Sequence, residues 1–143
     1  MKIQQVSIFL ENKKGRLSDV CSVLGKSGVN IRALTIAESE DFGVLRIVVD
    51  KPEPTLKLLK ENGFAAKLTP IVAVEVPDRP GGLAAVLKIL SDNDVNVEYM
   101  YGFVEKFGEN ALLVFRFDDP DKTVEILRKN GIKVLGNQDI IGF

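Results

Sequence analysis

Hydrophobic residues alternate along some stretches of the chain and recur every three or four positions along others. Residues 3–10 alternate and are rich in β-formers, so they predict a strand. Apolar residues from Leu17 to Leu24 recur at helical spacing and predict a helix that ends at Gly28. The same patterns predict further strands at 29–38, 44–50 and 64–68, and a helix from Pro52 to residue 62.

The second half of the chain repeats this order of elements. Gly15 and Asn30 of the first copy correspond to Gly81 and Asn96 of the second, with the same spacing between them. A repeat of this length is too long for a solenoid unit and matches a whole small domain. The second copy predicts strands at 71–76, 95–104, 111–117 and near Val134, with helices after the glycine loop and at 120–130.

Each copy therefore predicts the order β-α-β-β-α-β, which forms a four-stranded antiparallel sheet with both helices on one face. The expected fold class is α+β, with one such sandwich in residues 1–69 and another in residues 70–143. A domain of this size buries a modest fraction of its surface when it folds alone. We therefore expect the two sandwiches to pack together.

The predicted strands carry apolar residues on both faces. Leu34 and Ile36 point opposite to Ala33, and Met100 points opposite to Tyr99. These side chains cannot all lie under the helices, and a sheet with two apolar faces commonly packs against a partner. We therefore expect a homo-oligomer, most simply a homodimer.

Composition and charge exclude several classes of function. The 143 residues carry 19 Lys and Arg against 20 Asp and Glu, so no basic footprint for nucleic acid is present. The absence of histidine removes the most frequent general base and metal ligand, and the single cysteine, Cys21, lies on the apolar side of a predicted helix. Because no catalytic constellation remains, we expect a protein that is not an enzyme and holds no cofactor or metal.

No stretch of the sequence predicts a membrane segment or a leader. The longest aliphatic stretches, such as 71–74, are far too short to span a bilayer, and residues 1–5 precede no long apolar run. The expected location is the cytoplasm, without contact to a membrane.

Two strand-loop-helix junctions carry the candidate binding chemistry. Residues 12–17 and 78–83 each lead into a predicted helix N-terminus, where backbone N–H groups and the helix dipole favour an anion. Gly15 and Gly81 allow unusual dihedral angles and a close approach of the backbone. The alternative is that the glycines only form the turn, while the Asn or Asp of each loop caps the helix.

Asn30 and Asn96 each stand at the start of an apolar strand, where asparagine is disfavoured. A side-chain amide can hold a neighbouring backbone turn or contact a polar group of a ligand. Both interpretations of these two residues stay open at the level of sequence.

Residues 78–83, Asp-Arg-Pro-Gly-Gly-Leu, followed by the Val-Asn-Val of 95–97, resemble the signature of the ACT domain, a small amino-acid-sensing module. Residues 12–17 and 29–31 are similar, although Lys14 stands where the family usually has proline. The resemblance covers nearly the whole chain, as two ACT domains in tandem without a catalytic domain. It implies ferredoxin-like sandwiches, side-by-side pairing into a continuous sheet, and a small ligand, often an amino acid, at the pairing interface.

The resemblance also implies which residues contact the ligand. Its carboxylate would meet the backbone of the glycine loops, and the strand after each first helix would line the opposite side. Arg16 against Gly82 makes the two loops chemically unequal, so that one copy would bind while the other supports the interface. The implied residues are Asn12, Gly15, Arg16, Leu17, Asn30 and Ile31 in the first copy, and Asp78, Pro80, Gly81, Gly82, Leu83, Asn96 and Val97 in the second.

The favoured hypothesis is a regulatory protein that binds an amino acid and changes its own assembly, or its affinity for a regulated protein partner, when the ligand is bound. The alternative is an interaction module that assembles without a ligand. An acylphosphatase-like enzyme on the same topology would use Arg16 and Asn30, but their spacing does not match that family.

Overall fold

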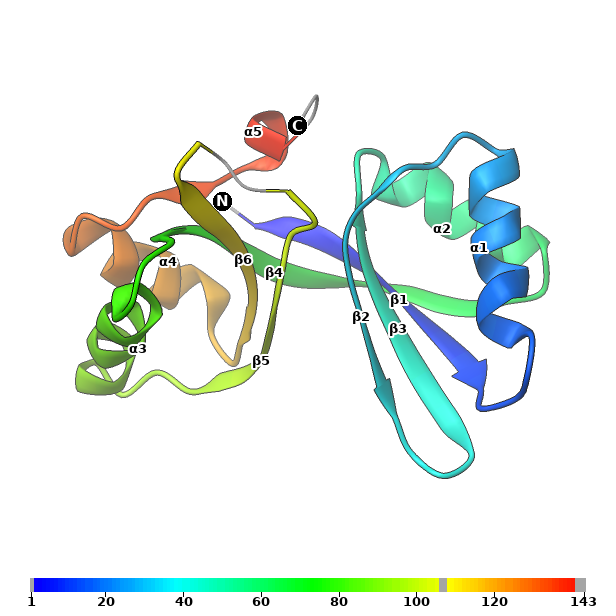
Figure 1. The fold of residues 1–143 in the computed structure, drawn as a ribbon, viewed down its shortest axis with the longest axis horizontal. Coiled ribbons are helices and arrows are strands. Elements are labelled where there is room, and N and C mark those ends of the chain that lie inside the picture. Colours follow the sequence, from blue (N-terminus) through cyan, green and yellow to red (C-terminus); the bar gives the residue numbers. More distant parts are fainter. Residues whose placement is uncertain (1, 106–107, 141–143) are drawn as a thin grey trace. The chain divides into compact units, whose positions relative to one another are not determined.

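The protein is described by a computed structural model that covers residues 2–105 and 108–140 (Figure 1). The described chain divides into two compact units. The first spans Gln4–Thr69 and is called the N-terminal unit; the second holds the other described residues and is called the C-terminal unit. Within the described part of the chain, no helix has the length and apolar character needed to cross a membrane.

The N-terminal unit is one sheet with two helices on a single face. Its strands follow the order β2-β3-β1-β4, and β3 is antiparallel to both β1 and β2. Its elements are β1 (Ile3–Glu11), α1 (Arg16–Lys26), β2 (Ile31–Glu38), β3 (Phe42–Val49), α2 (Pro52–Glu61) and the first part of β4 (Ala65–Pro77).

The core of the N-terminal unit lies between this sheet and its two helices. Val20 and Leu24 of α1 and Leu59 of α2 pack against alternate residues of β1 and β3. Because the strand period is two, one face of each strand meets the helices and the other does not. The strand residues in this core are Val6, Ile8, Leu10, Leu45, Ile47 and Val49.

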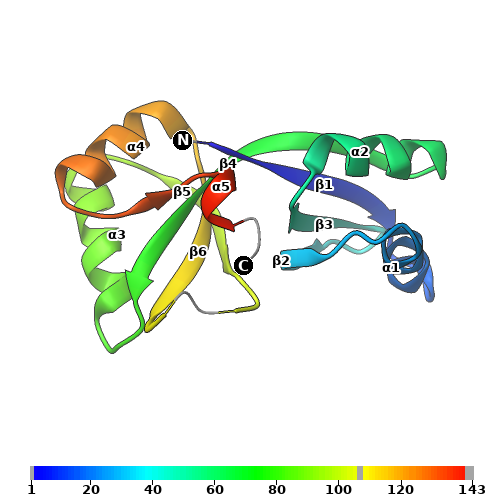
Figure 2. The same cartoon turned by 90° about the horizontal axis from the view of Figure 1, so that it is seen from above.

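The C-terminal unit repeats the arrangement, with strand order β5-β6-β4 and β7 paired to the free side of β4. In both views α3 and α4 lie together on one side of this sheet (Figure 1 and Figure 2). Its further elements are α3 (Gly82–Asp92), β5 (Val97–Gly102), β6 (Asn110–Phe117), α4 (Pro120–Lys129), β7 (Val134–Leu135) and α5 (Asn137–Ile140). The predicted α+β class with two β-α-β-β-α-β units is confirmed.

Two predicted strands, 64–68 and 71–76, form the single strand β4. Pro70 lies inside it, and the fixed φ of proline is compatible with extended backbone. The carbonyl oxygen of Pro70 accepts a hydrogen bond from Nη1 of Arg116 at 2.9 Å. Neither this continuity nor the short helix α5 was predicted, because both depend on neighbours that are remote in sequence.

The repeat extends to buried hydrogen bonds. The Oγ1 atoms of Thr55 and Thr123 each donate to the carbonyl oxygen four residues earlier, that of Lys51 and of Asp119, at 2.8 Å in both cases. Both threonines are buried at the start of the second helix of their unit. The two copies therefore share interior polar contacts as well as the order of their elements.

The exposed apolar residues of β2 lie on the helix-covered face of the sheet. Leu34 is opposite Ile47 and Ile36 is opposite Leu45, and both partners belong to the core. Leu34 and Ile36 are nevertheless 45% and 48% exposed. β2 ends the strand order of its unit, so the helices leave this edge uncovered.

Candidate functional site

The two glycine loops have the same left-handed residue at the same place. Gly15 (φ 90°) precedes α1 and Gly81 (φ 83°) precedes α3, and each is the N-cap of its helix. A residue with a β-carbon is strained at such φ values, which explains the glycines. Because the N-cap residue of each helix is a glycine, that residue contributes no side-chain hydrogen bond to its helix.

The backbone hydrogen bonds of the two loops also correspond. The N–H of Arg16 donates to the carbonyl of Lys13 at 3.3 Å, and the N–H of Gly82 donates to that of Arg79 at 3.0 Å. The loop with Lys14 therefore has the same hydrogen-bonded turn as the loop that carries proline at that place.

Asn12 does not cap α1, which corrects one alternative left open by the sequence. Its Nδ2 lies 3.2 Å from the carbonyl oxygen of Ser39 and 3.4 Å from that of Glu40. The side chain of Asn12 therefore ties the first glycine loop to the turn between β2 and β3. This contact joins residues far apart in sequence and has no local signal.

Arg16 and Gly82 show how the two loops differ. A methyl group at Gly82 would collide with the carbonyl of Pro77, so this position excludes a side chain. Arg16 places its guanidinium 4.9 Å from the centre of the Phe64 ring, with Nη1 3.7 Å from Oδ2 of Asp19. Nε of Arg16 is buried without a hydrogen-bond partner among the described residues.

The loop leucines also differ in their surroundings. Leu17 is 44% exposed, whereas Leu83 packs against the core of its unit. The difference between the loops is therefore local to these two pairs of positions, because the second loop also carries exposed side chains at Asp78, Arg79 and Pro80. The predicted inequality of the loops has a structural basis in these positions.

Asn30 and Asn96 directly precede β2 and β5 and are exposed. Within the described chain neither side chain forms a hydrogen bond, so neither holds the neighbouring turn. Ile31 and Val97, which follow them, pack against the cores of their units. The side-chain amides of Asn30 and Asn96 are therefore available to contact a ligand at the start of these strands.

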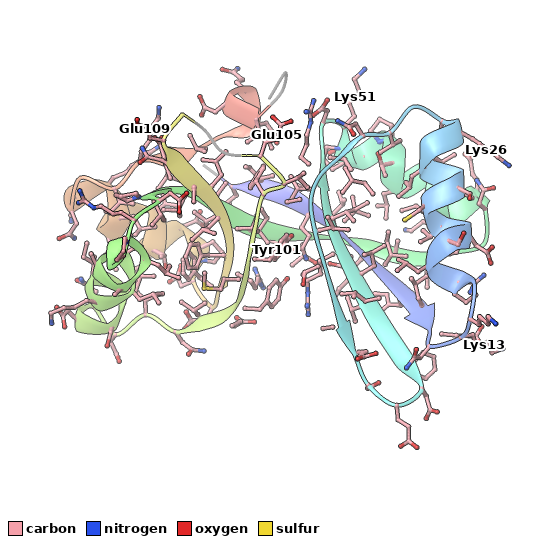
Figure 3. The ribbon with its side chains drawn as sticks, viewed as in Figure 1. Lys13, Lys26, Lys51, Tyr101, Glu105 and Glu109 are labelled. Atoms are coloured by element: carbon pink, nitrogen blue, oxygen red, sulfur yellow. The ribbon has the colours of Figure 1, made fainter. Side chains whose placement is uncertain are left out.

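The glycine loop and the asparagine of one unit lie at opposite ends of its first helix. α1 has 11 residues and is therefore about 16 Å long. Lys13 marks one end of α1 and Lys26 the other in Figure 3. The structure does not bring Gly15 and Asn30 together within one unit.

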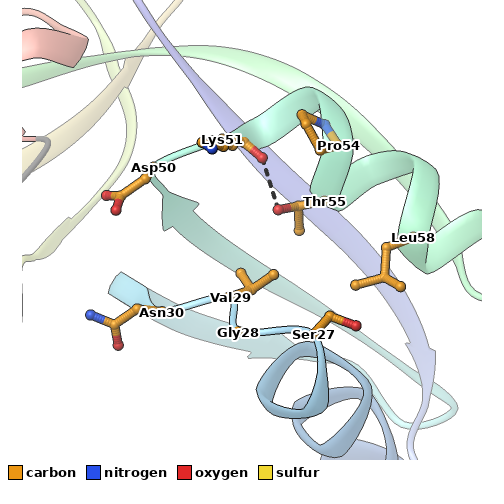
Figure 4. A pocket seen from close by; sticks show the side chains of 9 residues that line it. All are labelled: Ser27, Gly28, Val29, Asn30, Asp50, Lys51, Pro54, Thr55 and Leu58. Carbon is orange, nitrogen blue, oxygen red and sulfur yellow. Dashed lines mark hydrogen bonds between the residues drawn. The ribbon is translucent and has the colours of Figure 1, made fainter.

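A surface hollow of about 500 Å³ lies at the Asn30 end of the N-terminal unit (Figure 4). Sequence reasoning missed most of its residues, although Asp50 was visible as a repeated position that matches Asp118. The hollow is lined by Ser27, Gly28, Val29, Asn30, Asp50, Lys51, Pro54, Thr55 and Leu58.

Asp50 is held in place at this hollow by Arg32. Nε of Arg32 lies 3.0 Å from Oδ1 of Asp50, and Nη2 lies 3.2 Å from Oδ2. The Arg32 side chain is only 16% exposed, so the pair is partly shielded from water. A carboxylate has further lone pairs after two such bonds and can accept another donor.

One ionisable group next to the first glycine loop interacts with a neighbouring lysine. Hydrogen bonding and charge attraction from Lys13 lower the pKa of the exposed Glu11 carboxyl below its usual value. Among the described residues no group of three or more His, Cys, Asp or Glu side chains is placed to hold a metal ion.

The family model described as an ACT domain pair matches residues 1–143. Protein BT0572 from Bacteroides thetaiotaomicron is 43% identical, with a TM-score of 0.91 over 98% of this chain and 96% of that one. The ligand-free regulatory subunit of aspartate kinase from Thermus thermophilus is 14% identical, with a TM-score of 0.62 over 90% and 93% of the two chains. This last likeness concerns the fold alone.

A curated relative, the acetolactate synthase small subunit of Buchnera aphidicola subsp. Baizongia pistaciae, is 39% identical over 49 residues. The matched segment is 34% of this chain and 31% of that protein, so the chain spans about a third of the relative's length.

Proposed function

Because this chain belongs to the ACT domain pair family, we propose that it is a non-catalytic regulatory protein that binds an amino acid at its glycine loops. The observation that supports this proposal is the loop built twice, with a left-handed glycine as the N-cap residue of each helix. A helix N-terminus favours a carboxylate, and the amide of Asn30 or Asn96 offers a second polar contact.

In this proposal the site is completed between two protein chains. The glycine loop of one chain supplies the backbone N–H groups, and the asparagine at the start of a strand in the other chain faces it. Asn12, Ile31, Asp78, Pro80, Leu83 and Val97 then shape the site around these two contacts. Because the ligand bridges two rigid sheets, its binding shifts the assembly of the protein.

The two chains form a homodimer in this proposal. Leu34 and Ile36 form an exposed apolar row along the edge strand β2, and an unpaired edge strand is ready to pair with another chain. In this proposal the protein is cytoplasmic and its regulated partner is an enzyme of amino-acid metabolism, as the name of the acetolactate synthase small subunit suggests.

Isothermal titration calorimetry of the whole chain against the twenty common amino acids tests the proposal. We expect at least one of them to bind with a Kd below about 1 mM, and sedimentation to change on its addition. Gly82→Ala, which distorts the second loop, should weaken this binding, and Gly25→Ala, inside α1 with free space around it, should not. The absence of any binding would contradict the proposal.

A second candidate is an assembly module that needs no ligand, and the exposed Leu34 and Ile36 favour it. It predicts a stable oligomer whose sedimentation is the same with and without every amino acid.

A further inference from the structure

The hollow of Figure 4 lies at the opposite end of α1 from the first glycine loop and belongs to the N-terminal unit alone. We infer that it is a separate binding site for a small zwitterion, an α-amino acid with an apolar side chain. The inference takes the class of ligand from the proposed function, but apart from Asn30 it places the ligand at residues that the glycine-loop site does not use.

The charged and amide groups of the hollow lie toward one end, whereas the hydroxyl of Ser27 lies near Leu58 (Figure 4). Figure 4 shows Asp50 and Asn30 at one side and Leu58 at the other, with Val29 between them. The Asp50 carboxylate, already oriented by Arg32, accepts from the ligand ammonium group. Lys51, exposed at the rim, supplies a cation for the ligand carboxylate.

Aliphatic side chains contribute to the rest of the hollow. Val29, Pro54 and Leu58 line it together with Ser27 and with Thr55, whose Oγ1 already donates to the carbonyl oxygen of Lys51. A volume of about 500 Å³ lies within the range of small-ligand pockets, roughly 300–1,000 Å³. A charged pair at one end and aliphatic groups at the other match the two ends of an amino acid with an apolar side chain.

Side chains, and not the helix N-terminus, build this site. Pro52 and Pro54 carry no backbone N–H, so the first turn of α2 has few donors to offer. The N–H of Thr55 already donates to the carbonyl of Lys51 at 3.3 Å. Recognition of the ligand carboxylate therefore falls to Lys51 and the amide of Asn30.

The C-terminal unit provides an internal contrast. Gly28, Asp50 and Lys51 correspond there to Asp94, Asp118 and Asp119. Three carboxylates at this place repel an anionic group, and the cation of the C-terminal copy is displaced to Lys122, at the position of Pro54. Oδ1 of Asp119 also accepts from the N–H of Lys122 and is engaged as a helix cap. The N-terminal copy is therefore the better suited of the two to the carboxylate of a zwitterion.

Calorimetry of the whole protein with L-leucine and L-valine tests the inference. Leucinamide lacks the carboxylate and N-acetyl-leucine lacks the ammonium group. The affinity of each should be lower than that of L-leucine by roughly tenfold or more. Lys51→Asp, which installs the C-terminal residue, and Asp50→Asn should each weaken L-leucine binding by roughly tenfold or more. The matched control Asp118→Asn should leave it unchanged.

The loop variant Gly82→Ala separates this inference from the proposed function. If L-leucine binding is lost in Lys51→Asp and Asp50→Asn but retained in Gly82→Ala, the result supports a binding site in the hollow. If binding is lost in Gly82→Ala and unchanged in Lys51→Asp and Asp50→Asn, the result contradicts a site in the hollow and supports the glycine-loop site. If neither L-leucine nor L-valine binds the unaltered protein, the inference about the hollow is wrong, whereas the proposed function is still tested by the other amino acids.

Discussion

Single residues decide how alike the two glycine loops are. Gly15 and Gly81 share a left-handed conformation that the turn requires. Gly82 is required for a different reason, since a side chain there would meet the Pro77 carbonyl, whereas Arg16 at the matching place has room. The same backbone thus carries a different surface in each copy.

Gly82→Ala is expected to lower the free energy of unfolding by about 1–3 kcal/mol, because the new methyl group forces the loop away from Pro77. Urea denaturation measures the change. Gly25→Ala is the control: it lies within α1 with nothing within 4 Å of the added carbon, and it should stabilise by roughly 0.5–1 kcal/mol. Equal effects of the two substitutions would contradict the steric argument.

The pKa of Glu11 predicts a pH dependence at the first loop. Its pKa is lower in the folded state than in the unfolded state, because Lys13 donates to its carboxylate. Its contribution to stability is therefore present above the unfolded pKa and is lost as the pH falls through the folded pKa. In urea denaturation, the free energy of unfolding should fall less between pH 7 and pH 3 in Glu11→Gln than in the unaltered protein. An unchanged pH dependence in that variant would argue against the effect.

At the scale of elements, corresponding helices begin with the same buried threonine but different caps. The side chain of Asp119 accepts from the N–H of Lys122 and caps α4, whereas Lys51 gives α2 no such bond. The repeat therefore preserves the helices while it changes the chemistry at their N-termini. That change is what leaves Lys51 available beside the hollow.

Asp119→Ala is expected to cost about 1 kcal/mol of stability, because α4 loses its N-cap. Lys51→Ala, the matched change at α2, removes no cap and should leave the free energy of unfolding within about 0.5 kcal/mol of its starting value. Thermal and urea denaturation of both variants provide the comparison. Similar losses in both would show that the cap is not the cause.

For the whole molecule, the exposed row on β2 is the feature that bears on assembly. Leu34 and Ile36 face the helix side of their sheet and are left uncovered at its edge. Two such edges from two chains would pair their backbones and bury these side chains against each other.

In the proposed homodimer, replacing Leu34 and Ile36 together by lysine should therefore give a monomer, because charges on an edge strand oppose pairing. Analytical ultracentrifugation measures the state. Val104→Lys, at another exposed apolar residue outside the strands, is the control and should leave the dimer intact. A double variant that remains dimeric would place the interface elsewhere.

The two copies, the order of their elements and the positions of the glycine turns can all be predicted from the sequence. These features depend on hydrophobic periodicity and on local turn chemistry, which neighbouring residues encode. The folded chain was needed to see that Asn12 bonds to Ser39, that Gly15 and Asn30 lie at opposite ends of α1, and that Asp50 lines a hollow. Contacts between residues distant in sequence have no periodic signal, because they arise from how the elements pack.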